Sequence, residues 1–202
     1  MKRERAVSDR AAARADAQRE RILEAAQQCF VAEGFHAATM ATIADRAGMS
    51  AGLIYRYFEN KDAIVLAIID RELQRRRAHI ASKSGSADVA EGIIQAFRDL
   101  CSDSPLAASA VLFLEMTAQG TRVPRVAQAL EAADQATRRD FEQWWSRSRE
   151  EGGLGFTRER AQDAALLIQI LFEGLAVRAA REPGLDIERL RRAIIPVMER
   201  LS

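Results

Sequence analysis

Apolar residues in this chain recur at helical spacing along most of its length. In the segment 17–33 they fall on one face of a helix, at Ile22, Ala26, Cys29 and Phe30. A later run, starting at the potential N-cap Asn60, repeats the pattern at Ile64, Val65, Ile68 and Ile69. The alternation of β-branched and polar residues that is typical of strands is missing. The pattern predicts an all-α protein of about nine helices.

Between these two runs lies the segment TMATIADRAGMSAGLIYRYFENK, residues 39–61, which predicts two short helices joined by a glycine turn. One face of the first helix carries the apolar residues Met40, Ile43, Ala44 and Ala47. Gly48 follows at once, where the end of a helix favours a residue that tolerates left-handed dihedrals. Ser50 is a good N-cap for the second helix, whose inward residues are one turn apart, at Ile54 and Phe58.

The outward face of this second short helix has a distinctive chemistry. It consists of Ser50, Ala51, Gly52, Leu53, Tyr55, Arg56 and Tyr57. The side chains are small at the N-terminal end, and further along the helix they carry hydroxyls and one guanidinium. Such a face suits insertion into the major groove of DNA. The alternative interpretation is a structural helical hairpin that never meets DNA.

Glycine, proline and one short polar stretch divide the rest of the chain. The sequence SKSGS, residues 82–86, is the best linker candidate. Beyond it the pattern predicts helices at about 86–102, 105–119, 123–151, 157–181 and 186–201. We therefore expect a flexible basic arm over 1–16, a helix-turn-helix domain over 17–81 and a second helical domain over 82–202.

The charge of the chain is nearly balanced overall but unevenly placed. The 202 residues carry a formal charge of +1, with 15 basic and 11 acidic residues before position 84 and 15 basic and 18 acidic residues after it. A polyanion would therefore be met by the N-terminal part. Chance scatter of a few charges explains the asymmetry equally well.

The sequence contains little that points to catalysis, metal binding or a membrane. Cys29 and Cys101 lie in apolar helical contexts without a CxxC spacing, which favours packing residues in a reducing cytosol. The histidines are His36 and His79, and although Glu33 and His36 make an ExxH spacing, Gly34 interrupts it. No nucleotide-binding or hydrolase motif, spanning apolar run or secretory signal occurs. We expect a cytoplasmic protein with no catalytic residue, metal or cofactor.

The segments RERILEAAQQCFVAEGF and TMATIADRAGMSAGLIYRYFENKDAI together resemble the DNA-binding domain of the tetracycline-repressor (TetR) family of bacterial transcriptional regulators. The resemblance covers about residues 19–70 and is specific in order and spacing. It implies a homodimeric repressor that binds a palindromic operator in double-stranded DNA and is released when a small-molecule effector binds the C-terminal domain. An all-helical small-molecule carrier or interaction protein that does not bind DNA is the alternative function.

The resemblance also implies a role for each residue of the motif. Thr39 and Thr42 would hydrogen-bond phosphates, and Tyr55, Tyr57 and Lys61 would hold further phosphates. Base edges would be approached by Ser50, Ala51, Gly52 and Leu53. Many family members have Lys, Arg or Gln at the position of Ala51, and His at that of Arg56. Arg56 is then either the direct base reader or one more phosphate contact.

The C-terminal helices carry more apolar surface than one helix face can bury. The segment AALLIQILFEGLAVRAA, residues 164–180, is apolar on two faces, and the last helix also carries an apolar stripe. Spare apolar faces favour a dimer interface, as the resemblance implies, and a monomer that buries both faces is the alternative. The expected interface residues are Leu167, Ile170, Leu171, Gly174, Val177, Leu190, Ile194 and Val197.

The resemblance finally implies an effector cavity among the helices of the second domain. The candidates for its lining are mainly aromatic and apolar: Phe97, Cys101, Phe113, Met116, Gln119, Phe141, Trp144, Trp145, Gln169 and Phe172. Such a lining would suit a hydrophobic or flat aromatic ligand. For any single one of these residues, a place in the ordinary core is the alternative. Ligand binding would shift the helix that joins the domains and move the recognition helices out of half-site spacing.

Overall fold

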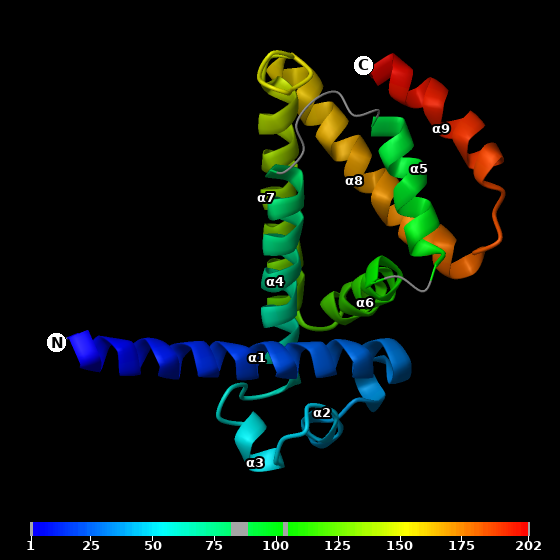
Figure 1. The fold of residues 1–202 in the computed structure, drawn as a ribbon. Helices are drawn as coiled ribbons and strands as arrows, with labels where there is room; N and C mark the ends of the chain where they lie inside the picture. Colours follow the sequence, from blue (N-terminus) through cyan, green and yellow to red (C-terminus); the bar gives the residue numbers. More distant parts are fainter. Residues whose placement is uncertain (1, 82–88, 103–104, 202) are drawn as a thin grey trace. The chain divides into compact units, whose positions relative to one another are not determined.

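The computed structural model describes residues 2–81, 89–102 and 105–201, and within these ranges the chain forms nine α-helices and no strand (Figure 1). The all-α expectation is therefore confirmed. The helices are α1 Lys2–Ala37, α2 Met40–Arg46, α3 Ala51–Ile54, α4 Lys61–Ala81, α5 Val89–Leu100, α6 Pro105–Gly120, α7 Pro124–Ser146, α8 Arg158–Arg181 and α9 Ile187–Leu201.

The chain divides into two units, Met1–Ile68 and Ile69–Ser202, so the division falls inside α4. We expected the boundary one half-helix later, at residue 82. The linker expected at 82–86 lies outside the described residues. A boundary inside a continuous helix has no glycine, proline or polar stretch to mark it, and composition therefore does not reveal it.

Helix α1 is longer than expected at both ends. It begins at Lys2, although residues 1–16 were expected to form a flexible arm, and the Ala and Arg residues that dominate this stretch are strong helix formers. Gly34 interrupts the helix as expected, with φ 79° and ψ 162°, but a last turn follows it to Ala37. Glycine adopts such dihedrals without the steric cost that a Cβ would add.

The first unit is built around side chains from all of its helices. The residues expected to face inward from α1 (Ile22, Ala26, Cys29 and Phe30) are all buried, as are Ile43 and Ala44 of α2. Ile54 of α3 and Phe58 after it are also buried, together with Ile64, Val65 and Ile68 of α4. The inward pattern read from the sequence is therefore confirmed in this unit.

The second unit has a separate core that gathers side chains from α5, α7, α8 and α9. Phe97 and Trp145 are the largest almost fully buried side chains of this core, and the other members include Ile93, Ile94, Trp144, Ala164, Ala165, Ile168, Leu175, Ile194 and Met198. Helix α7 packs against α6 and α8, and α5 packs against α9. Helix α7 ends at Ser146, not 151, because the chain turns back and the Trp144 indole N–H donates to the Gly152 carbonyl at 3.0 Å.

Within the described part of the chain, no helix combines the length and the apolarity that are needed to cross a membrane. The two cysteines, Cys29 and Cys101, are both free thiols.

Candidate DNA-binding surface and effector cavity

Helix α2 begins with a reciprocal cap made by two threonines. The Thr39 hydroxyl accepts a hydrogen bond from the Thr42 amide at 3.0 Å, and the Thr39 amide donates to the Thr42 hydroxyl at 2.9 Å. The Thr42 hydroxyl in turn donates to the Thr39 carbonyl at 2.9 Å. Both side chains are exposed, but their hydroxyls, which were expected to bind phosphate, already close the first turn of α2.

The turn between α2 and α3 is held by α1. Gly48 has a φ of +63°, the left-handed conformation expected from its place after the helix. The Arg21 guanidinium donates to the Ala47 carbonyl at 2.6 Å and so caps the end of α2. The Arg19 guanidinium lies 4.5 Å from the centre of the Phe58 ring. Two arginines of α1 therefore fix both ends of the segment from Ala47 to Phe58.

Helix α3 is short, and its outward face is open to solvent. After Ile54 the backbone continues in turns, with the Phe58 amide bonded to the Ile54 carbonyl at 3.0 Å. Ser50 is the N-cap by position, yet its hydroxyl makes no capping hydrogen bond. Of the residues expected to face DNA, five are exposed (Ser50, Ala51, Gly52, Tyr55 and Arg56), and Leu53 and Tyr57 are half-buried. The face that is expected to meet DNA is thus largely exposed, and Ile54 and Phe58 form its buried support.

Lys61 has a different environment from the one expected. Its ammonium donates to the carbonyls of Phe35 at 2.7 Å and Ala38 at 2.6 Å, and it lies 4.4 Å from the centre of the Phe35 ring. Burial lowers the pKa of Lys61, and the neighbouring Asp62 opposes that shift. The side chain therefore binds the carbonyls that follow Gly34. This is a structural role, and the expected phosphate contact of Lys61 stays a prediction.

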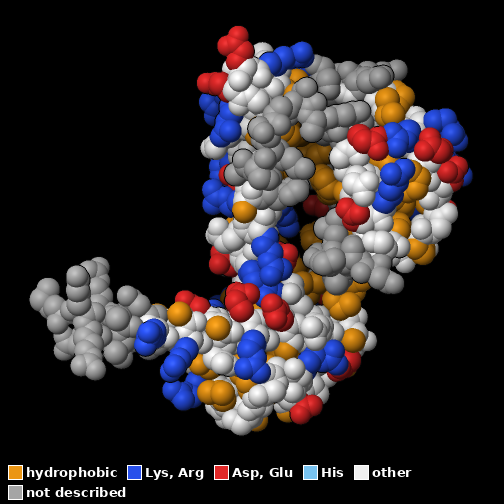
Figure 2. Space-filling view, viewed as in Figure 1, with side chains coloured by type: hydrophobic (Ala, Val, Ile, Leu, Met, Phe, Trp, Pro, Cys, Tyr) orange, Lys and Arg blue, Asp and Glu red, His pale blue; other side chains and the backbone are white. Residues whose placement is uncertain are grey.

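The remaining basic residues of the unit fall into two groups. Arg46 pairs with Glu33 at 3.3 Å, and Arg19 and Arg21 are engaged as described above. In contrast, Arg10, Arg14 and Arg56 are exposed, and their guanidinium groups have no hydrogen bond or ion pair within the described part of the chain. Basic side chains are visible on this unit in Figure 2. Arg56 is therefore the cation beside the α3 face that is available to a phosphate or a base.

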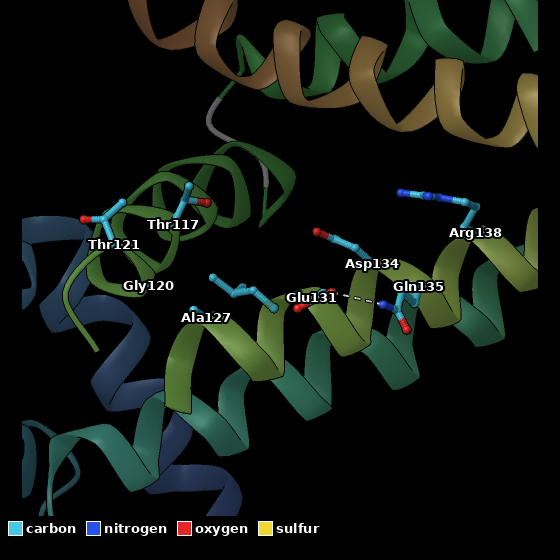
Figure 3. Close-up of a pocket in the computed structure, with 9 residues that line it drawn as sticks. Thr117, Gly120, Thr121, Ala127, Glu131, Asp134, Gln135 and Arg138 are labelled. Carbon is cyan, nitrogen blue, oxygen red and sulfur yellow. Dashed lines mark hydrogen bonds between the residues drawn. The ribbon is translucent and has the colours of Figure 1, made fainter. Parts of the chain in front are cut away.

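The second unit has a cavity of about 470 Å³ formed by α6 and α7 (Figure 3). Six of its nine lining residues have polar side chains, and the lining consists of Thr117, Gly120, Thr121, Ala127, Leu130, Glu131, Asp134, Gln135 and Arg138. This volume is in the range of small-molecule sites. None of the ten residues expected to line an effector cavity is among these nine.

The ten expected residues have other places in the unit. Phe97, Trp144 and Trp145 belong to the core, and Cys101 and Phe141 pack against it. Met116 and Gln119 are buried on α6, Phe113 is half-buried, and Phe172 is exposed. Phe97, Trp144 and Trp145 therefore lie in the core, which is the alternative that the sequence left open for each of the ten residues. An effector contact by any of the ten stays a prediction.

Gln169, one of the ten expected residues, contacts two residues of the cavity lining through its side-chain amide. Its amide oxygen accepts a hydrogen bond from the Arg138 guanidinium Nε at 2.9 Å, and its amide nitrogen donates to the Asp134 carbonyl at 2.9 Å. This buried glutamine thus fixes the direction of the Arg138 side chain.

Two carboxyl groups near the cavity have shifted pKa values. Burial raises the pKa of Asp134, and the positive charges of Arg76 and Arg138 oppose the shift. Burial, together with the negative charge of Asp134, raises the pKa of Glu173. Arg76, on α4, donates to the Thr137 hydroxyl of α7 at 3.3 Å. The acids and arginines of α4, α7 and α8 therefore form one electrostatic cluster beside the cavity.

The sequence did contain a signal for this cavity. Glu131, Asp134, Gln135 and Arg138 are spaced i, i+3, i+4 and i+7, which places four polar side chains on one face of α7. Such a stripe is more often a solvated surface, and the opposite wall, on α6, cannot be inferred from the spacing. No group of three metal-binding side chains occurs among the residues that the structure describes.

Helix α8 exposes an apolar face. Leu166, Ile170 and Val177 are 43%, 54% and 39% exposed, and Val197 of α9 is 44% exposed. Gly174 lies in the same stripe, and a Cβ added there would meet nothing within 4 Å. Other residues expected at the interface are used within the unit: Ile194 belongs to its core, Leu171 and Leu190 pack against that core, and Leu167 is half-buried. The exposed part of the expected interface is therefore Ile170, Gly174, Val177 and Val197.

Comparison with known proteins identifies both units. Residues 22–68 match the model of bacterial regulatory proteins of the tetR family, and residues 87–200 match the C-terminal domain of BetI-type transcriptional repressors. The HTH-type transcriptional regulator UidR of Escherichia coli is 26% identical over 158 residues, which cover 78% of this chain and 80% of UidR.

Solved structures show the same fold. GusR of Salmonella enterica aligns with a TM-score of 0.69 at 24% identity and covers 91% of this chain and 96% of its own. A transcriptional regulator of Saccharomonospora viridis in complex with choline aligns with a TM-score of 0.67 at 20% identity, over 91% of this chain and 96% of its own. Since the two family models together match most of the sequence, the chain belongs to the TetR family of transcriptional regulators.

Proposed function

We propose that this protein is a homodimeric repressor that binds a palindromic operator and leaves it when a small effector occupies the α6–α7 cavity. The observation that carries the DNA-binding part is the exposed face of α3. Ser50, Ala51 and Gly52 are small and exposed, and they stand on a buried support that α1 holds through Arg19 and Arg21. A rigid, small and polar helix end can approach base edges closely.

Each residue of the face has a proposed role. Ser50, Ala51, Gly52 and Leu53 approach the bases, with the apolar groups of Ala51 and Leu53 against thymine methyls. Tyr55 and Tyr57 bind phosphates through their hydroxyls, and the α2 N-terminus with Thr39 and Thr42 lies near another phosphate. Arg56 contacts a phosphate, because it follows α3 at the far end from Ser50. The readout face has few long donors, so DNA shape contributes to specificity.

The dimer part of the proposal rests on α8. Leu166, Ile170 and Val177 form an apolar stripe that the described residues do not cover, and Gly174 leaves room for a close approach. A second copy of this face is its proposed partner, because a two-fold dimer presents two recognition helices to two half-sites about 34–36 Å apart, or a multiple of that distance. The operator would then be palindromic, and the dimer would act in the cytoplasm, where bacterial DNA lies.

The effector part rests on the cavity and its link to α4. Arg76 and Arg77 of α4 bond to Thr137 and Asp140 of α7, the helix that carries the cavity residues Glu131, Asp134 and Arg138. A ligand that moves α7 therefore changes the contacts of α4, which runs on into the DNA-binding unit. The Saccharomonospora viridis relative holds choline. Because polar side chains line this cavity, we propose a polar ligand in place of the hydrophobic or aromatic ligand expected from the sequence.

The direct test measures binding to DNA that flanks the coding region by fluorescence anisotropy at several salt concentrations. We expect tight, sequence-dependent binding, and the logarithm of the binding constant should fall linearly with the logarithm of the salt concentration. Arg56→Ala should weaken binding to all sequences alike and reduce the salt slope by about one. Arg192→Ala, which removes an exposed arginine of α9, is the matched control and should leave the slope unchanged.

Two outcomes would contradict parts of this proposal. Binding that does not depend on sequence or salt would support the carrier function instead. Loss of preference at a single G·C pair in Arg56→Ala would assign Arg56 to base reading, a contact of about 1–3 kcal/mol, in place of phosphate binding.

A further inference from the structure

The wall of the cavity formed by α6 offers few hydrogen-bond donors. The Thr117 hydroxyl donates to the Phe113 carbonyl at 2.8 Å, and the Thr121 hydroxyl donates to the Ala118 carbonyl at 2.7 Å. Both hydroxyl protons are therefore used in bonds to backbone carbonyls of α6. What these threonines can offer a ligand is the accepting capacity of their oxygens.

The wall formed by α7 also consists mainly of acceptors. The Gln135 side-chain amide donates to Glu131 at 3.2 Å (Figure 3). The Gln135 amide oxygen, one of its N–H groups and the second Glu131 oxygen therefore remain available to a ligand. The Asp134 carboxylate accepts no hydrogen bond from any residue that the structure describes. Among the described lining residues Arg138 is the only cation, and its Nε already donates to Gln169.

The site also carries more acidic than basic side chains, which favours a ligand that donates hydrogen bonds and carries positive charge. Glu131 and Asp134 line the cavity, and the negative charge of Asp134 helps to raise the pKa of the nearby Glu173. Arg138 acts on both Asp134 and Glu173, and Arg76 is shared between the same two acids. Burial of Asp134 raises its pKa in spite of both arginines, as expected for a carboxylate whose charge is incompletely compensated.

From this arrangement we infer that the cavity binds a small ligand with a protonated primary or secondary amine, whose N–H groups donate to Asp134 and Glu131. The two carboxylates are one turn apart on α7, with Cβ atoms about 5–6 Å from each other, so one ammonium can reach both. The inference rests on the proposed effector role of the cavity and adds the chemical class of the ligand.

The lining distinguishes this ligand from a quaternary ammonium. A quaternary group has no N–H to donate and is recognised mainly by the faces of aromatic rings. None of the nine lining residues is aromatic, and the aromatic side chains Trp144, Trp145 and Phe97 are buried in the core. An ammonium with N–H groups can instead donate to the Asp134 carboxylate and to the second Glu131 oxygen.

The test uses four probes that share a four-carbon chain with a terminal hydroxyl: 4-aminobutan-1-ol, its N,N,N-trimethyl derivative, butane-1,4-diol and 4-hydroxybutyrate. Each is titrated at millimolar concentrations into the DNA-free full-length protein, and binding is followed by NMR. We expect the primary amine to bind about tenfold more tightly than the other three, since charge-assisted hydrogen bonds are the strong ones. Asp134→Asn and Glu131→Gln should each remove this preference, whereas Glu142→Gln, an acid of α7 outside the cavity, should retain it.

Several results would overturn the inference: equal or tighter binding of the trimethyl derivative or of 4-hydroxybutyrate, no binding of the primary amine, or an undiminished preference in both Asp134→Asn and Glu131→Gln. Glu131 is exposed, so its substitution tests the site even where Asp134→Asn folds poorly. Amine binding that leaves operator binding unchanged would contradict the proposed function and not the ligand class. Operator release by a ligand without an amine would contradict the ligand class and not the proposed function.

Discussion

At the scale of single residues, Lys61 shows how a side chain can match a motif and still have another role. Its position at the start of α4 suggested a phosphate contact, but its ammonium binds the carbonyls of Phe35 and Ala38. These carbonyls belong to a part of the chain more than twenty residues earlier, where Gly34 ends the regular helix. No local pattern around Lys61 contains that information, and only the tertiary structure brings the groups together.

We predict that Lys61→Met destabilises the protein without changing the electrostatics of DNA binding. Two carbonyls lose a charged donor, which should lower the free energy of unfolding by about 1–3 kcal/mol, measured by urea denaturation. The salt slope of operator binding should stay the same. Arg56→Met is the reciprocal control, with unchanged stability and a slope reduced by about one. A reduced slope in Lys61→Met with normal stability would restore its role as a phosphate anchor.

At the scale of elements, the α2–turn–α3 segment followed from the sequence because its determinants are local. The apolar spacing of Ile43 and Ala44, the glycine after α2 and the burial of Ile54 and Phe58 all depend on neighbours within one or two turns. The capping of α2 by Arg21 is different, since this residue comes from α1. Periodicity predicts which face of a helix is inward, but not which side chain of another helix completes its end.

The cavity between α6 and α7 illustrates the same limit. Aromatic residues at helical spacing are compatible with a core or with a cavity, and in Phe97, Trp144 and Trp145 they form the core. The polar stripe of α7 from Glu131 to Arg138 is compatible with a solvated face or with a cavity wall, and α6 makes it a wall. Both alternatives have the same period, so the choice depends on which helices become neighbours.

For the α2–α3 turn we predict opposite effects of adding a methyl group at two glycines. Gly48→Ala places a Cβ at φ +63° and 3.3 Å from the Arg21 guanidinium, and should lower stability by about 1–2 kcal/mol. Gly52→Ala lies in α3 with nothing within 4 Å and should raise stability by about 0.5–1 kcal/mol. Thermal unfolding measures both effects.

Operator binding separates the two substitutions further. Because Gly52 lies on the proposed readout face, its added methyl should weaken operator binding even though the free protein becomes more stable. Unchanged affinity in Gly52→Ala would mean that α3 does not approach the bases at this residue. A Gly48→Ala protein as stable as the parent would contradict the argument from the left-handed turn.

At the scale of the whole molecule, the sequence indicated too many apolar residues for one core but could not divide them between core and interface. Ile194, Leu171 and Leu190 were expected at an interface and are used within the unit, whereas Ile170 and Val177 remain exposed. Leu and Ile at helical spacing have the same signature in both places. The exposed fraction of each side chain in the structure distinguishes core from interface residues. The residues of α8 that remain exposed form an apolar stripe that an assembled dimer would cover.

We predict that Ile170→Arg converts the protein to a monomer. Ile170 is 54% exposed in the single chain, so a charged side chain there should not disturb the folding of the unit, but it would be desolvated and face its own copy across a two-fold interface. Sedimentation velocity should show the monomer mass with unchanged helicity, and affinity for a full palindrome should fall at least about tenfold, towards that for a half-site. Gln143→Arg, at an exposed position of α7, should remain dimeric. A dimer that persists in Ile170→Arg would show that the two copies associate through another face.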